Sequence, residues 1–343
     1  MFKFEKEQTV LDFNGYKIGG QPGEFPRVLG ASIFYNKHET VLDEHTGKID
    51  KPRAEALWNR CLELYEETGN WYFCQIIAEF GEAFDSYLSW FTEIDDEFPF
   101  LMDSSAPDAL AHACEYVTEV GIADRAVYNS INGSIGPENM EALKKSDVSS
   151  AIVLAFNPGD PSVRGREQVL TQGGVAGQTM SMIDIATECG ITRPILDTAA
   201  TPLGLGSGGS FREILACKAI HGLPTGGAYH NMTVSWTWLK RWRKPDGGRL
   251  TERYANAGLL LEQMGHHHYG GLEGIRQAAW SSPDVGCNIM AATLGADLLM
   301  FGPIENCEAA ATSAAFCDIV LAETFRELGG DIATDKHPLK LLV

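Results

Sequence analysis

The chain has 343 residues, enough to bury a large core in one α/β domain or in two smaller domains. Its formal net charge of −19 at pH 7 argues against nucleic acid as a ligand, because proteins that bind phosphate backbones carry basic faces. Residues 1–20 lack the apolar core of a signal peptide, and no run approaches about 18 apolar residues, so we expect a cytoplasmic protein without membrane insertion.

Short apolar runs alternate with amphipathic stretches, which predicts strands alternating with helices. The expected strands are 27–34, 71–77, 98–102, 125–128, 150–156, 193–196, 225–230 and 296–301. The expected helices are 52–69, 82–94, 107–121, 137–146, 177–190, 211–222, a helix that begins near Asn231 and ends in 239–244, and 305–329. This repeat predicts an α/β fold of the (β/α)₈ or TIM-barrel type, whose functional site lies at the C-terminal ends of the strands.

Two segments do not fit the alternation. Residues 1–26 precede the first strand, and we expect a hairpin or a barrel lid there. Residues 243–283 are Gly-rich, contain a helical pattern near 250–264 and exceed an ordinary connection between the seventh and eighth strands. Because this segment is too short for an independent core, we expect an insertion on a single domain that spans residues 1–343.

The segment Gly204–Gly209 fits G-x-G-x-x-G, the fingerprint of a dinucleotide-binding turn. Such a site also needs an acidic residue about 20 positions further on. Residues 214–245 contain no Asp or Glu, so the pattern argues against a nicotinamide enzyme. Either the glycines let the backbone approach a flat ligand closely, or they form a flexible turn into the next helix.

No metal site is expected from the cysteines and histidines. The eight cysteines stand singly without C-x-x-C, which is typical of reduced thiols in a cytosolic protein. His112 and Cys114 are two residues apart in an expected helix and therefore point away from each other. His266, His267 and His268 are adjacent, and adjacent side chains rarely converge on one ion.

Five successive expected strands are followed by Asp or Asn. These residues are Asp103, Asn129, Asn157, Asp197 and Asn231. Each alone can cap a helix or form a turn, but five on one rim of a barrel indicate a shared ligand. No Ser–His–Asp set or Cys–His pair accompanies them, so nucleophilic mechanisms have no obvious agent. Amides and carboxylates suit a flat heterocycle such as a pterin, whose 2-amino group and ring N–H can donate two parallel bonds to one carboxylate.

Seven stretches carry a closer resemblance. They are IGGQPGEFPRVLGASIFY, FLMDSS, RAVYNSING, AFNPGDPSVRGRE, LDTAATPLG, HNMTVSW and GADLLMFGPIEN. In this order they closely resemble the MtrH subunit of tetrahydromethanopterin S-methyltransferase and its bacterial relatives, the methylcorrinoid:tetrahydrofolate methyltransferases. The resemblance spans nearly the whole chain except 243–283.

The resemblance implies a barrel of the dihydropteroate-synthase type that binds a reduced pterin. It also implies exchange of a methyl group between nitrogen 5 of the pterin and the cobalt of a corrinoid (cobalamin). The residues that would hold the pterin are Asp103, Asn129, Asn157 and Asp197, with Asp160 as a further neighbour. Asn231 would lie near nitrogen 5 and act as the catalytic residue.

We therefore expect a methyltransferase that moves a methyl group between a protein-bound methylcorrinoid and tetrahydrofolate, giving 5-methyltetrahydrofolate. Tetrahydrofolate is preferred to tetrahydromethanopterin because 243–283 departs from the archaeal subunit pattern and no docking segment for a membrane complex is evident. The alternatives are a tetrahydromethanopterin-linked subunit, pteroate synthesis on the same barrel, and a pterin-binding subunit without catalysis of its own.

The sequence contains no corrinoid-binding module, because the D-x-H-x-x-G signature is absent. We expect the corrinoid to arrive on a partner protein and no metal to be bound directly. A homodimer is also expected.

Overall fold

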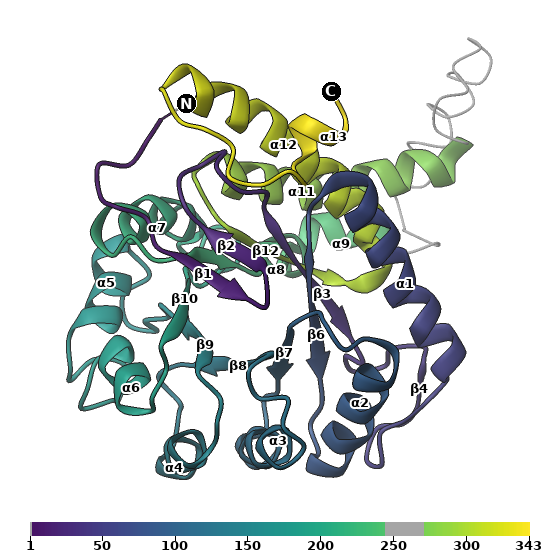
Figure 1. Ribbon diagram of the computed structural model, residues 1–343, viewed down its shortest axis with the longest axis vertical. Helices are drawn as coiled ribbons and strands as arrows, with labels where there is room; N and C mark the ends of the chain where they lie inside the picture. Colours follow the sequence, from purple (N-terminus) through teal and green to yellow (C-terminus); the bar gives the residue numbers. More distant parts are fainter. Residues whose placement is uncertain (1, 244–270) are drawn as a thin grey trace.

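The computed structural model describes residues 2–243 and 271–343. Its centre is a closed barrel of eight parallel strands in the order β10-β11-β12-β3-β6-β7-β8-β9 (Figure 1). The strands are β3 (Val28–Ile33), β6 (Tyr72–Ile77), β7 (Phe100–Asp103), β8 (Ala126–Ile131), β9 (Ser150–Leu154), β10 (Arg193–Asp197), β11 (Thr225–Gly227) and β12 (Leu298–Pro303). The predicted (β/α)₈ barrel is therefore confirmed, with every expected strand overlapping one of these.

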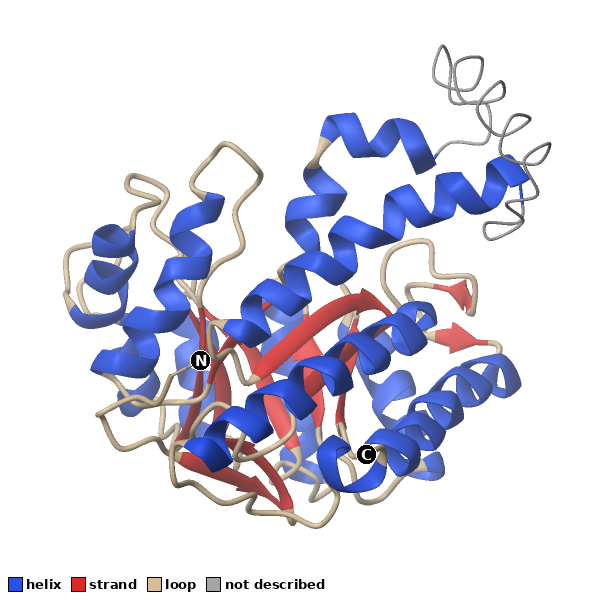
Figure 2. Ribbon diagram, turned by 90° about the horizontal axis from the view of Figure 1, so that it is seen from above, coloured by secondary structure: helices blue, strands red, loops and turns tan. Residues whose placement is uncertain are grey.

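Helices surround the barrel and follow its strands in sequence (Figures 1 and 2). They are α1 (Lys51–Thr68), α2 (Gly81–Ile94), α3 (Pro107–Glu119), α4 (Pro137–Lys145), α5 (Val163–Thr171), α6 (Met182–Glu188), α7 (Ser207–Ile220), α8 (His230–Ser235), α9 (Thr237–Arg243), α11 (Gly271–Thr293), the 3-10 helix η1 (Ile304–Asn306), α12 (Cys307–Glu327) and α13 (Pro338–Leu341). Proline in the first turn starts α1, α3 and α4, where a missing N–H costs no hydrogen bond.

The sequence misplaced two helical regions. α5 was not predicted, and the helix expected at 177–190 is shorter because Ala176 and Gly177 have positive φ in a turn before α6. The helix expected from Asn231 to 244 is two helices, since the extended backbone of Trp236 separates α8 from α9. Figure 2 shows α9 and α11 side by side, projecting beyond the barrel.

The expected insertion at 243–283 is only partly within the described residues. Its last part, from Gly271, is the start of α11, the helix that leads into β12. The helical pattern near 250–264 lies outside the described residues. The segment therefore contributes a regular helix of the barrel at its C-terminal end.

The N-terminal segment forms an antiparallel hairpin of β1 (Val10–Phe13) and β2 (Tyr16–Gly19). Asn14 and Gly15 both have positive φ at its turn, as a two-residue hairpin loop of this hand requires. The Lys17 carbonyl accepts from Trp71 Nε1 at 2.9 Å, at the start of β6, and the Asp12 carbonyl accepts from Arg193, which begins β10. The hairpin thus lies at the N-terminal ends of the strands, opposite the end where a barrel binds its ligand. A second hairpin, β4 (Val41–Asp43) and β5 (Lys48–Ile49), precedes α1.

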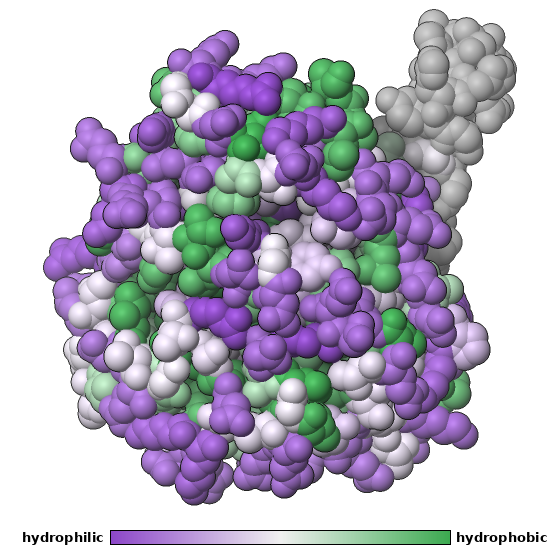
Figure 3. All heavy atoms as spheres, viewed as in Figure 1, coloured by the Kyte–Doolittle hydropathy of each residue, from purple (hydrophilic) through white to green (hydrophobic). Residues whose placement is uncertain are grey.

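None of the described helices is both long and apolar enough to cross a membrane. The face in Figure 3 is covered largely by hydrophilic residues, with smaller hydrophobic areas between them.

A buried ion pair joins the first and last parts of the barrel. Arg27 Nε lies 3.1 Å from Asp318 Oδ1, and both side chains are fully buried. Asp318 Oδ2 also accepts from the backbone N–H of Arg27 at 2.8 Å and from Asn70 Nδ2 at 2.7 Å. These contacts fix the start of β3 and the entry to β6 against α12, so the barrel's outer helix and its strands depend on one carboxylate.

The substitution Asp318→Ala should lower the free energy of unfolding by about 3–5 kcal/mol, because it leaves the Arg27 charge buried without its partner. Glu93→Ala is the matched control, since Glu93 pairs with Lys51 on the surface, where such a pair contributes about 1 kcal/mol or less. Urea denaturation of the two variants measures both effects. Equal small losses would show that the buried pair does not stabilise the barrel.

Candidate functional site

Three of the predicted residues lie at the C-terminal ends of barrel strands, inside the strands rather than after them. Asp103 is the last residue of β7, Asp197 is the last residue of β10, and Asn129 lies within β8. Asp103 and Asn129 are paired in register on neighbouring strands. Their side chains therefore share one face of the barrel wall.

The Asp103 carboxyl ends a chain of hydrogen bonds across three strands. Gln75 Nε2 on β6 donates to Asp103 Oδ2 at 2.5 Å, and Gln75 Oε1 accepts from Ser32 Oγ on β3 at 3.0 Å. Burial raises the pKa of Asp103 to about 6, the Gln75 bond opposes this, and the charge of Glu79 adds to it. The sequence analysis missed Ser32 and Gln75, although each is a polar residue inside an otherwise apolar strand, and that was the available signal.

The Asp197 carboxyl is buried at the end of β10, with 7% of the residue exposed. Its Oδ1 accepts from the backbone N–H of Ala199 at 2.8 Å. Burial raises the pKa of Asp197 to about 7, against the lowering effect of the Ala199 bond, and the negative charge of Asp103 raises it further. The two carboxyl groups are thus electrostatically coupled, and a ligand that donates hydrogen bonds would relieve the cost of ionising them.

Asn157 and Asp160 build the turn that leads into α5. Asn157 Oδ1 accepts from the backbone N–H groups of Gly159 and Asp160 at 3.0 and 3.2 Å, and its Nδ2 donates to the Gly165 carbonyl. Asp160 accepts from Ser162, and these bonds lower the pKa of Asp160. Within the described residues, no hydrogen bond links either side chain to Asp103 or Asp197.

Asn231 lies within α8 rather than directly after the seventh strand. The N-cap of α8 is Tyr229, so Asn231 does not cap the helix. Its exposed side chain lines a cavity of about 490 Å³, which is also lined by Ser32 and His230. Because Ser32 belongs to the hydrogen-bond chain that ends at Asp103, the cavity and the carboxyl pair lie at the same end of the barrel.

His230 was not predicted. Its Nδ1 lies 2.9 Å from the Met300 carbonyl, which can only accept, so Nδ1 carries the proton and Nε2 is an acceptor in the neutral ring. Burial lowers the pKa of His230. The cavity is therefore lined by an amide and by a neutral imidazole that can accept a proton.

The glycine-rich segment 204–209 packs against the turn before α5. A Cβ atom at Gly206 would lie 2.6 Å from Pro161 Cβ, and one at Gly209 would lie 2.6 Å from the Pro161 carbonyl oxygen. These two glycines are required by contacts within the protein, and α7 begins inside the motif.

Comparison with known proteins identifies the family. A family model described as the tetrahydromethanopterin S-methyltransferase MtrH subunit matches residues 6–333. The corresponding subunit of tetrahydromethanopterin S-methyltransferase from Methanosarcina barkeri is 44% identical over 345 residues, covering 100% of both chains. The Methanopyrus kandleri subunit is 41% identical over 337 residues, covering 98% of each chain.

Among solved structures, the fold is similar to that of dihydropteroate synthases. The Yersinia pestis enzyme with a pterine-sulfa conjugate has a TM-score of 0.53 at 13% identity and covers 94% of this chain and 100% of its own. The enzyme from Vibrio fischeri has a TM-score of 0.52 at 13% identity and covers 91% of this chain and 98% of its own. The predicted dihydropteroate-synthase-like barrel is confirmed.

The full-length alignments change one argument from the sequence. Tetrahydrofolate was preferred because 243–283 departs from the archaeal pattern, yet the alignment with the Methanosarcina barkeri subunit runs through all of both chains. A segment of that length is not peculiar to this chain. The comparisons therefore favour the tetrahydromethanopterin alternative over tetrahydrofolate.

The raised pKa of Asp197 predicts a pH dependence of stability. An unfolded Asp titrates near about 4, so the folded chain binds the extra proton between about pH 4 and 7. Stability from this group is complete below that range and is lost as the pH rises through about 7. Compared with Asp197→Asn, the wild-type chain should therefore lose more of its free energy of unfolding between pH 5 and pH 8.

Denaturation curves at the two pH values measure this difference. Asp43→Asn is the control, because the lowered pKa of exposed Asp43 leaves it ionised in both states throughout this range. Wild-type and Asp197→Asn curves with the same pH dependence would contradict the assignment.

Proposed function

The chain belongs to the family of the tetrahydromethanopterin S-methyltransferase MtrH subunit, and from this premise we propose that it transfers a methyl group between a reduced pterin and a corrinoid held by another protein. The pterin is of the tetrahydromethanopterin type. The observation that carries the proposal is the full-length identity of 44% to a subunit of that enzyme. Homodimer formation and a cytoplasmic location stay predictions.

The carboxyl pair supports recognition of the pterin. Asp103, with the less raised pKa of about 6, is the group more readily ionised at neutral pH and would accept from the 2-amino group and ring N–H. Asp197, with a pKa of about 7, would exchange between donor and acceptor and so match a ring nitrogen or carbonyl. Asn129, paired in register with Asp103, would supply an amide to the same edge of the ring.

The cavity beside this pair supports the transfer step. Asn231 and His230 line it together, and both come from α8. Nitrogen 5 of the pterin gains positive charge when it is methylated and needs a proton when its methyl group leaves. The Asn231 carbonyl would stabilise that positive charge, and its N–H₂ group would orient a water that carries the proton. The neutral His230 ring would accept a proton from this water through Nε2.

The corrinoid supplies the cobalt that gives or takes the methyl group. Because it arrives on another protein, this chain's part is to hold the pterin in line with it, a positioning role that contributes much of the rate. Asn157 and Asp160 would support this role indirectly, by shaping the turn before α5.

The proposal is tested by turnover of purified chain with methylcobalamin and either tetrahydromethanopterin or tetrahydrofolate. We expect methyl transfer to tetrahydromethanopterin with a higher kcat/KM than to tetrahydrofolate, and a higher rate still when the corrinoid is supplied on its carrier protein. Preference for tetrahydrofolate would restore the other pterin. Binding of the pterin without transfer from either corrinoid source would identify a pterin-binding subunit without catalysis of its own.

The variants Asn231→Ala and Asp103→Asn should separate rate from affinity. Asn231→Ala should lower the transfer rate by roughly 10²–10³, because one preorganised electrostatic group is lost, and should change pterin affinity little. Asp103→Asn should weaken pterin binding by about 1.5–3 kcal/mol, the scale of a hydrogen bond to a charged group. Stopped-flow rates and calorimetry measure the two effects. A normal rate for Asn231→Ala would remove it from the transfer step.

A further inference from the structure

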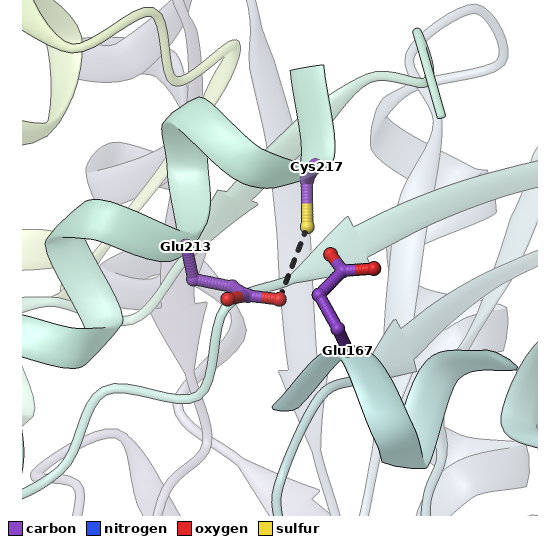
Figure 4. Close-up of side chains that lie close together, drawn as sticks. All are labelled: Glu167, Glu213 and Cys217. Atoms are coloured by element: carbon purple, nitrogen blue, oxygen red, sulfur yellow. Dashed lines mark hydrogen bonds between the residues drawn. The ribbon is translucent and has the colours of Figure 1, made fainter. Parts of the chain in front are cut away.

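A second group of acidic and sulfur side chains lies between α5 and α7, outside the barrel. Glu213 and Cys217 are four residues apart on α7 and so share one helix face, and Glu167 approaches them from α5. Figure 4 shows the two carboxyl groups and the sulfur turned toward one another. One oxygen of each carboxyl and the Cys217 sulfur all lie within 4.8 Å of one another.

The group is buried, and two of its oxygens have no partner. Glu213 and Cys217 are both 0% exposed. Glu213 Oε2 and Glu167 Oε1 are buried oxygens without a hydrogen-bond partner. Glu213 Oε1 has only a long contact of 3.8 Å from the Cys217 sulfur. A buried carboxylate without hydrogen bonds or a paired cation is strongly unfavourable, so this site needs a further positive charge.

Arg166 does not supply enough charge. Its Nε donates to the Thr198 carbonyl, and its Nη2 donates to the Ala199 carbonyl and to Ser210 Oγ, so these bonds are directed at the loop after β10. If Cys217 is a thiolate, the three side chains carry three negative charges against the one positive charge of Arg166. A divalent cation would bring the sum to zero.

We propose that Glu167, Glu213 and Cys217 bind one zinc ion, contrary to the expectation from the sequence that no metal is bound directly. Zinc accepts thiolate and carboxylate ligands together, whereas magnesium and calcium take oxygen ligands. His221, the C-cap residue of α7, lies four residues beyond Cys217, and its Nε2 is 3.0 Å from Glu167 Oε2. This imidazole orients the Glu167 carboxylate, as hydrogen-bonding groups around metal ligands commonly do.

The site would have a structural role. Glu167 directly follows Arg166, whose guanidinium holds the carbonyls of Thr198 and Ala199, the two residues after Asp197. A zinc ion that joins α5 to α7 would therefore fix Arg166 and, through it, the loop that carries Asp197. The proposal is independent of the substrate, because it concerns the helices rather than the end of the barrel where the strands finish.

The test uses full-length chain stripped of metal by a chelator and titrated with Co²⁺, a spectroscopic substitute for zinc. We expect a thiolate-to-cobalt charge-transfer band in the near ultraviolet that saturates at one equivalent and disappears when Zn²⁺ is added. His266, His267 and His268 also offer metal ligands, but they contain no sulfur and cannot give this band. The band therefore reports a cysteine ligand alone.

Matched variants identify which cysteine is involved. Cys217→Ser should abolish the band, whereas Cys307→Ser should keep it, although Cys307 is also a buried thiol beside a glutamate, Glu308. Glu213→Gln should weaken Co²⁺ binding by more than about 100-fold, since it removes a ligand rather than an outer contact. A band that survives in Cys217→Ser, or no band in the wild-type chain, would overturn the proposal.

Thermal melting guards against variants that fail to fold. Zn²⁺ should raise the melting temperature of the wild-type chain and of Cys307→Ser, and it should leave Glu213→Gln unchanged. The competing arrangement is a proton shared between Glu167 and Glu213, consistent with the pKa of Glu213 being raised to about 8 by burial and by Glu167. In that case Zn²⁺ would change neither the spectrum nor the melting temperature, and the site would hold a proton instead.

Discussion

The architecture depends on how closely β11 approaches its two neighbours in the closed barrel. A Cβ atom at Gly226 would lie 2.2 Å from the Leu298 carbonyl oxygen on β12, and one at Gly227 would lie 2.9 Å from Asp197 Oδ1 on β10. The first glycine lets the barrel close, and the second leaves room for the Asp197 carboxyl inside its rim. Closure of the sheet and placement of a candidate ligand-binding group therefore follow from the same pair of residues without side chains.

The carboxyl end of the barrel is organised by a second set of contacts, centred on Arg166. This buried side chain bonds the carbonyls that follow Asp197 and the Ser210 hydroxyl in α7, and it comes from α5. A loop after one strand is thus held by helices from two successive βα units. Glycines 206 and 209 are part of the same arrangement, because side chains there would collide with Pro161.

The strands and the fold class were predictable because buried parallel strands are nearly continuous apolar runs, and eight such runs alternated with helices. Asp103, Asn129 and Asp197 were predicted to lie near strand ends, and they do. Their role in binding stays a prediction. Asn157 was chosen by the same rule, but an Asn after a strand serves equally well in a turn, and the sequence does not distinguish the two uses.

Other parts of the candidate site depend on contacts that sequence spacing does not reveal. Gln75 and Ser32 belong to the site because three strands place them in one line of hydrogen bonds. Asn231 was expected after a strand and lies in a helix, since β11 ends at Gly227 and a new helix begins at His230. Glu213, Cys217 and His221 do show a regular spacing of four, but their meaning depends on Glu167 from α5, a helix the sequence analysis did not predict.

Burial is the common cause of the raised pKa values of Asp103, Asp197 and Glu213, yet the surroundings of these groups call for different partners. The first two lie at the end of the barrel where ligands bind, so hydrogen bonds donated by a flat heterocycle can stabilise their ionised forms. Glu213 lies between two helices beside a second carboxyl and a thiol, where no such ligand fits and a compact cation is the matching charge. A proton is the alternative occupant in each case. The same physical cost therefore marks two places in the chain, one suited to exchange with a substrate and one suited to permanent occupation.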